Sequence, residues 1–191
     1  MKVLLLGDSI RIGAQFYLNT YLPDDWTVLS PCENCGTSNN IKKKLDGWDI
    51  GADIVHINCG LHDIRFLEGT DHPVVGLEEY QANLESIFIR LKTKGCRVVW
   101  GTTTPFNETV LNAYAESFSC GDRRYERDLY RYNDVSRSIA LKHKVRINDI
   151  FLKLTELDTT PLFFEDALHF NDDGNNVIGQ LISESLLESI E

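Results

Sequence analysis

Three residues whose side chains can together perform acyl transfer lie near opposite ends of the chain: Ser9, Asp166 and His169. A serine alcohol is a weak nucleophile at neutral pH, so it needs a histidine to accept its proton and a carboxylate to orient that histidine. Asp166 and His169 lie only three residues apart. We therefore predict a serine nucleophile, a histidine base and an orienting aspartate.

The residues around Ser9 predict where its hydroxyl lies. The apolar run in residues 1–7 is typical of a fully buried parallel strand, and the Gly7-Asp8-Ser9 turn leads into a helical pattern. Open α/β sheets bind their ligands at the carboxyl ends of strands, where helix N-termini favour negative charge. The sequence thus places Ser9 at a ligand-binding edge.

Strand and helix patterns alternate along the whole chain. Apolar segments predict strands at residues 1–7, 26–30, 53–58, 97–102 and 144–149, with helical periodicity in most of the intervals. This alternation predicts a parallel sheet with helices on both faces, and right-handed crossovers make a doubly wound sheet the simplest topology. A length of 191 residues fits a single α/β domain, residues 1–191.

Two segments near the predicted edge carry further expectations. Residues 9–22 are expected to form one helix that turns Ile12 and Phe16 inward and stops at Pro23. Residues 106–125 form the least regular segment, which is either a lid over the site or a plain surface excursion. Long loops in compact domains are more often functional than not.

Composition excludes several kinds of partner. The formal net charge of −10 argues against nucleic acid and anionic membranes, because both bind clustered lysine and arginine. The apolar start is too short for a leader and no run could span a membrane, so the expected location is cytoplasmic.

The cysteines indicate neither disulfides nor a metal site. Their odd number, five, fits a reducing compartment. Cys32 and Cys35 have C-x-x-C spacing but no second pair, so no metal is expected.

Other polar residues have simpler interpretations. His56 alternates within a buried strand and is expected to be a core histidine. Arg11 and Arg65 each follow one of the predicted polar turns and are possible substrate contacts. The arginines 123, 124, 127 and 131 alternate with acidic residues, which favours a solvated, ion-paired helix over an anion site.

These motifs together resemble the SGNH hydrolases of the GDSL type. Gly7-Asp8-Ser9 matches the family's first block, and Gly36 matches its glycine block. The third block, Gly-x-Asn-Asp, corresponds to residues 60–63, with His62 in place of the asparagine. Asp166 and His169 match the last block. The resemblance spans residues 3–170 with the blocks in the family's order.

The resemblance implies a three-layer α/β/α fold with five parallel strands in flavodoxin-like order, ester or thioester substrates, and no cofactor. Ser9 would attack the ester carbonyl, His169 would act as general base, and Asp166 would orient the imidazole. The backbone N–H groups of Ser9 and Gly36 would donate to the oxyanion. His62 would supply the third donor in place of the usual amide.

The expected function is a serine esterase that acts through an acyl-enzyme on short-acyl esters, such as acetyl esters, of small molecules or carbohydrates. A thioesterase or lysophospholipase, and a ligand-binding relative without turnover, remain alternatives. A nucleotide-binding protein is disfavoured because the first turn lacks a glycine-rich phosphate loop. The sequence leaves the oligomeric state open.

Overall fold

The computed structural model describes residues 1–48, 51–118 and 120–190. It contains a five-stranded parallel sheet in the order β2-β1-β3-β4-β5. The strands are β1 Lys2–Leu6, β2 Thr27–Leu29, β3 Ile54–Ile57, β4 Arg97–Gly101 and β5 Arg146–Asn148. Both the predicted parallel sheet and its flavodoxin-like order are confirmed.

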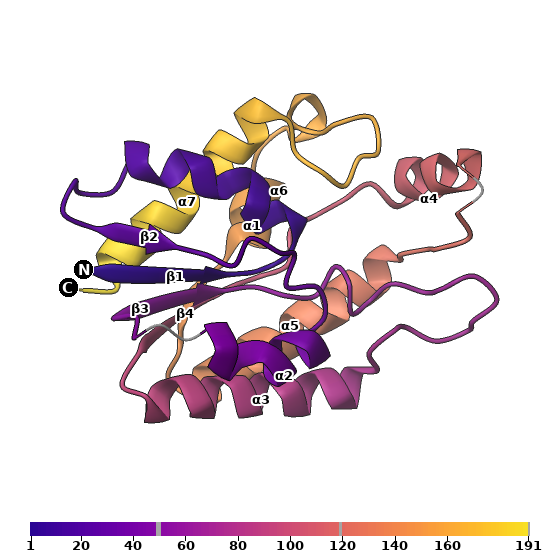
Figure 1. Cartoon of the computed structure of the whole chain (residues 1–191). Helices are drawn as coiled ribbons and strands as arrows, with labels where there is room; N and C mark the ends of the chain where they lie inside the picture. The colour runs from indigo at the N-terminus through magenta and orange to yellow at the C-terminus, as the bar shows by residue number, and fades with distance from the viewer. Residues whose placement is uncertain (49–50, 119, 191) are drawn as a thin grey trace.

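Helices cover both faces of this sheet and form a three-layer α/β/α arrangement (Figure 1). One layer holds α1 Ser9–Ala14, the 3₁₀ helix η1 Gln15–Thr20, α6 Ile150–Thr155 and α7 Asp172–Glu188. The opposite layer holds α2 Ser38–Trp48, α3 Leu77–Thr93 and α5 Glu126–Lys142. A short 3₁₀ helix, η2 Thr160–Leu162, precedes the loop that leads into α7.

The central strands are apolar because both of their faces are covered. Val3, Leu5 and Leu6 in β1 and every residue of β3 are buried.

No helix in the described parts of the chain is both long and apolar enough to cross a membrane.

The first helix differs from its prediction. The α-helical part ends at Ala14, and the chain continues as the 3₁₀ helix η1. A 3₁₀ helix turns about 120° per residue instead of about 100°, so a side chain placed by α-helical periodicity points elsewhere. Phe16 is accordingly 75% exposed and does not turn inward, which corrects the prediction.

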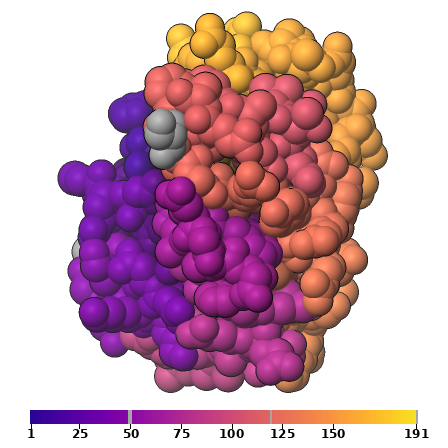
Figure 2. Space-filling model, turned by 90° about the vertical axis from the view of Figure 1, so that its right-hand side faces the viewer, coloured from indigo at the N-terminus to yellow at the C-terminus, as the bar shows by residue number. Residues whose placement is uncertain are grey.

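The segment at residues 106–125 also differs from its prediction, because much of it forms a helix, α4 Glu108–Ser117. Asn107 caps this helix by accepting a hydrogen bond from the N–H of Val110 at 3.0 Å. Residue 119 of the predicted segment lies outside the described residues. Helix α4 lies beyond the carboxyl ends of the strands (Figure 1), at the edge of the molecule that Figure 2 views face on.

Candidate active site

Ser9 is the first residue of α1 and lies directly beyond the carboxyl end of β1. Asp8 is fully buried and caps the helix by accepting a hydrogen bond from the N–H of Ile10 at 3.0 Å. A Cβ atom on Gly7 would lie 2.1 Å from Oδ1 of Asn58, so the chain can pass here only with glycine. The Gly-Asp-Ser turn therefore holds Ser9 at the edge that the sequence predicts.

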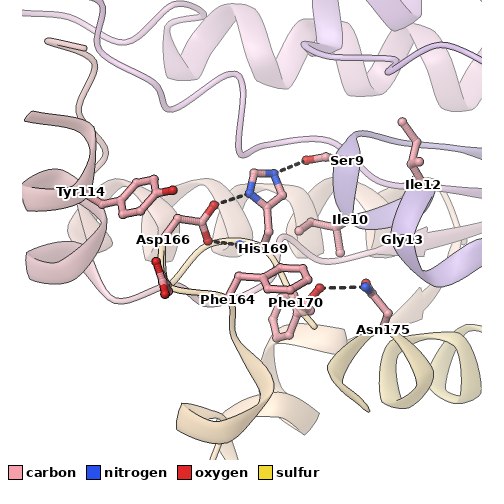
Figure 3. Close-up of a pocket in the computed structure, with 11 residues that line it drawn as sticks. Ser9, Ile10, Ile12, Gly13, Tyr114, Phe164, Asp166, His169, Phe170 and Asn175 are labelled. Carbon is pink, nitrogen blue, oxygen red and sulfur yellow. Dashed lines mark hydrogen bonds and ion pairs between the residues drawn. The ribbon is translucent and has the colours of Figure 1, made fainter. Parts of the chain in front are cut away.

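His169 and Asp166 reach this edge from the loop before α7, and the three side chains form a chain of hydrogen bonds (Figure 3). The Ser9 Oγ to His169 Nε2 distance is 2.8 Å. The His169 Nδ1 to Asp166 Oδ2 distance is 2.5 Å. The predicted nucleophile, base and orienting carboxylate are thus brought together from positions about 160 residues apart in the sequence.

The carboxylate of Asp166 is held by its own loop. Its Oδ1 atom accepts hydrogen bonds from the backbone N–H groups of Leu168 at 3.0 Å and of His169 at 2.9 Å. Burial raises the pKa of Asp166, but the hydrogen bonds from the His169 ring and from these two N–H groups outweigh it, so the pKa lies below its usual value. Asp166 is therefore ionised at neutral pH and accepts the Nδ1 hydrogen of His169.

The same loop contacts α4. Ala167 adopts a left-handed conformation with φ of +50°, and its carbonyl accepts a hydrogen bond from the N–H of Asn107 at 3.1 Å. Because Asn107 caps α4, the start of that helix is tied to the loop that carries Asp166 and His169.

A cavity of about 580 Å³ opens beside Ser9 and His169 (Figure 3). Its apolar walls come from α1, α4 and the loop before α7, namely Ile10, Ile12, Tyr114, Phe164 and Phe170. Glu165 and Asn175 add polar groups. The cavity offers an apolar chain a place directly next to the serine hydroxyl.

The role of Gly36 as an oxyanion donor stays a prediction, and its N–H already has a partner in this structure. Its φ of +64° suits glycine, but its N–H donates to Oδ1 of Asn34 at 2.8 Å. The Asn34 side chain therefore occupies the donor that the resemblance assigns to the oxyanion, and it would have to turn away to free it.

His62 lies in the turn after β3, with its ring partly buried. Burial lowers the pKa of His62, and the positive charges of Arg124 and Arg65 lower it further, whereas the charge of Asp8 opposes them. The imidazole is therefore neutral at pH 7 and carries one N–H donor. It has no hydrogen-bond partner within the described parts of the chain, so this donor is available to a ligand.

The predicted substrate contact of Arg11 is wrong. The residue is 1% exposed, and its guanidinium donates to the carbonyls of Gly7, Pro31 and Glu33 at 3.2, 3.0 and 2.7 Å. Arg11 thus fastens the loop that contains Gly36 to the end of β1. Arg65 remains partly exposed, with one Nη atom 3.3 Å from Asp122, and its substrate contact stays a prediction.

His56 is a buried core residue, as predicted. Its Nε2 lies 3.3 Å from Nδ2 of Asn148, and burial lowers the pKa of His56 to about 3.

The two cysteines with C-x-x-C spacing are not joined by a disulfide. Cys32 is exposed and Cys35 buried, and both are free thiols. Among the residues that the structure describes, no group of three or more histidine, cysteine, aspartate or glutamate side chains could hold a metal ion.

Of the aromatic residues in the cavity wall, the sequence indicated Tyr114, together with Phe106 and Phe118, as material for an apolar channel, but Phe164 and Phe170 were missed. Phe164 lies two residues before Asp166, and Tyr114 belongs to the segment expected to be irregular. The available signal for Tyr114 was the helix cap at Asn107, which places it two turns along a helix that begins beside the triad loop.

Comparisons with known proteins identify the fold. No family model and no curated protein sequence matches the chain. Among solved structures, the acetyl xylan esterase AlAXEase matches with a TM-score of 0.80 and 14% identity, covering 97% of this chain and 100% of that one. The lipase/acylhydrolase from Enterococcus faecalis matches with a TM-score of 0.73 and 18% identity, covering 97% and 94%. A GDSL-like lipase from Bacteroides thetaiotaomicron matches with a TM-score of 0.73 and 13% identity, covering 98% and 88%.

The chain therefore has the fold of the GDSL-type SGNH hydrolases, as the sequence resemblance predicts. At identities of 13 to 18%, these likenesses show the fold alone.

Proposed function

We propose that this protein is a carboxylic ester hydrolase with Ser9 as nucleophile, His169 as general base and Asp166 as orienting carboxylate. The observation that supports this most is the pair of hydrogen bonds from Ser9 to His169 at 2.8 Å and from His169 to Asp166 at 2.5 Å. A serine hydroxyl, an imidazole and a carboxylate in this order form the arrangement that activates a serine.

In the first half of the reaction, Ser9 Oγ attacks the carbonyl carbon of the ester while its proton moves to Nε2 of His169. Asp166 stabilises the resulting imidazolium through the Nδ1 hydrogen, and the carbonyl oxygen becomes an oxyanion. The tetrahedral intermediate then collapses, the carbon–oxygen bond to the alcohol breaks, and His169 returns the proton to the departing alkoxide. The alcohol leaves and an acyl-serine ester remains.

In the second half, a water molecule attacks the acyl carbonyl and gives a proton to His169. The bond to Ser9 Oγ breaks, His169 protonates that oxygen, and the carboxylic acid leaves. All of the proton transfers are carried by Ser9, His169 and water, with Asp166 ionised throughout.

For the oxyanion we propose two donors, the backbone N–H of Ser9 at the N-terminus of α1 and the ring N–H of His62. Donors aimed at a developing negative charge are worth more than ordinary hydrogen bonds because they cost no reorganisation during the reaction. The N–H of Gly36 joins them only when Asn34 releases it.

Different observations favour a short and a long acyl group in the substrate. A short acyl group follows the sequence resemblance and the acetyl xylan esterase that shares the fold. A longer apolar acyl chain is favoured by the cavity beside Ser9, with its isoleucine and aromatic walls.

Hydrolysis of p-nitrophenyl acetate, butyrate and octanoate by wild-type protein and by Ser9→Ala tests the activity and the acyl preference together. We expect turnover that Ser9→Ala loses by at least about 10³-fold, because the nucleophile is gone. A rate that falls with chain length indicates a short-acyl enzyme, and one that rises indicates an acyl chain in the cavity. Equal rates for Ser9→Ala and wild-type protein would overturn the proposal.

A further inference from the structure

Two arginines meet near the candidate active site, one from each of two distant segments. Phe66 and Arg123 form an antiparallel bridge, with Phe66 N–H to Arg123 O at 2.8 Å and Arg123 N–H to Phe66 O at 2.9 Å. Arg65 and Arg124 adjoin this bridge, one on each segment. Like charges placed on adjacent backbone segments repel one another, so this placement has an energetic cost.

Arg124 is oriented towards the turn that carries His62. Its Nε donates to the carbonyl of Leu61 at 2.7 Å. Its backbone is held at both polar atoms by the side chain of Asn112, with distances of 3.1 Å to the N–H and 3.0 Å to the carbonyl. The guanidinium is therefore positioned before any ligand arrives, one residue from the proposed oxyanion donor.

Among the described residues, Arg65 forms an ion pair with Asp122, whereas Arg124 forms none and is acted on at longer range by the charges of Asp8 and Asp122. Arg65 has one Nη atom 3.3 Å from Asp122, while its buried Nε has no partner. The Nη atoms of Arg124 have neither a hydrogen bond nor an ion pair within the described parts of the chain. Burial and the charge of Arg65 together lower the pKa of Arg124 to about 10, although the charges of Asp8 and Asp122 oppose this shift. The two guanidinium groups thus keep unused hydrogen-bond donors beside the turn that carries His62.

The neighbouring arginines do not share this property. Arg123 lies 2.8 Å from Glu116, and Arg127 and Arg131 both face Asp128 at 3.6 and 3.4 Å. Arg127 and Arg131 thus lie on an exposed, ion-paired helix, as predicted from the sequence, whereas Arg123 is ion-paired but precedes α5. Arg124 is the exception, and it lies in a protein whose formal net charge is −10. A local positive site in an acidic protein attracts anions selectively to that position.

We infer that Arg65 and Arg124 bind an anionic group, a carboxylate or a phosphate, carried by the ester that Ser9 hydrolyses. Guanidinium groups suit both anions because their forked donors match two oxygens at once. Neither arginine lines the apolar cavity, so the anion belongs to one portion of the ester and the apolar chain to the other. This inference rests on the proposed function for the identity of the substrate, but the anion site can be tested without turnover.

Calorimetric titration of Ser9→Ala protein at constant ionic strength, with benzoate, phenyl phosphate and neutral benzyl alcohol, tests the site. We expect at least one of the two anions to bind about 10-fold more tightly than benzyl alcohol, as charge-assisted hydrogen bonds predict. Whichever anion binds more tightly identifies the group as carboxylate or phosphate. Adding Arg124→Gln or Arg65→Gln should remove the preference, whereas the matched control Arg123→Gln should keep it.

A turnover assay links the site to specificity. The ratio of kcat/KM for 4-acetoxybenzoate to that for 4-acetoxybenzamide should fall about 10-fold in Arg65→Gln and Arg124→Gln and stay unchanged in Arg123→Gln. Thermal unfolding of each variant separates loss of binding from loss of folding, and Arg124→Lys, which retains the charge, should recover part of the preference. Equal binding of charged and neutral ligands, or equal effects of Arg124→Gln and Arg123→Gln, would overturn the inference. Absent turnover with intact anion binding would instead overturn the proposed function.

Discussion

His62 is the residue at which this site departs most from the pattern that its motifs resemble. A neutral imidazole offers one N–H donor, whereas the amide of asparagine offers two on a shorter side chain. Burial and the nearby positive charges keep the pKa of His62 low, so the ring does not add a full positive charge to the site at neutral pH. Its contribution to an oxyanion would therefore come from one directed hydrogen bond.

Replacing His62 tests this role. We predict that His62→Ala lowers kcat on a p-nitrophenyl ester about 10²- to 10³-fold with little change in KM, because the lost donor acts on the transition state. The matched variant His62→Asn supplies an amide donor at the same position and should recover part of the rate. A His62→Ala protein that folds normally and retains wild-type kcat would place the donor elsewhere.

At the residue scale, the sequence predicted the three residues of the Ser-His-Asp arrangement. It did not predict hydrogen bonds whose partners lie in irregular loops. The serine, its histidine and its aspartate follow from residue type, spacing and position at strand ends. The predicted substrate contact of Arg11 was wrong because its partners, the carbonyls of Pro31 and Glu33, lie in a segment without periodicity. The hydrogen bond from Gly36 to the side chain of Asn34 could not be predicted for the same reason. Arg124 was grouped with exposed arginines because sequence alternation does not reveal which side chain turns inward.

At the element scale, the five strands and most helices follow from apolar periodicity, since each must bury a face against the sheet. The two errors have local causes. Helix α1 tightens into a 3₁₀ turn after Ala14, which rotates Phe16 into solvent. Helix α4 buries only Leu111, so it lacks the apolar stripe by which helices are recognised.

Helix α4 contacts both the loop that carries His169 and the cavity beside Ser9. Asn107 joins its start to the triad loop through the carbonyl of Ala167, and Tyr114 contributes to the cavity wall. The helix therefore forms part of the wall of the cavity beside Ser9 and is not only a surface excursion. Whether it also closes over bound substrate as a lid stays a prediction.

At the scale of the whole molecule, one buried carboxyl group couples folding to pH. Asp63 is fully buried, and its Oδ1 accepts hydrogen bonds from the N–H of Ser38 at 2.9 Å and from its hydroxyl at 2.5 Å. Burial raises the pKa of Asp63 to about 7 despite these hydrogen bonds. Since the unfolded value is about 3.9, the native state holds this proton more tightly, and its stability falls as the pH rises from about 4 to 7.

Asp63→Asn should remove this pH dependence while keeping an acceptor for Ser38. Measured by urea unfolding, the free energy of unfolding of the variant minus that of wild-type protein should be higher at pH 8 than at pH 5 by on the order of 2 kcal/mol, because only wild-type protein loses stability over this range. Asp25→Asn, at an exposed aspartate, is the control and should show no such difference. A constant difference between Asp63→Asn and wild-type protein across this range would refute the assignment.

Covalent labelling tests whether Ser9 is a nucleophile that His169 and Asp166 activate. A fluorophosphonate reacts when the serine oxygen bonds to phosphorus and fluoride leaves, so it reports activation without knowledge of the natural ester. We predict that intact-protein and peptide mass spectrometry will find one label per chain, on Ser9, absent in Ser9→Ala and strongly slowed in His169→Ala. An unlabelled Ser9 in folded protein, or labelling that His169→Ala does not slow, would contradict this account.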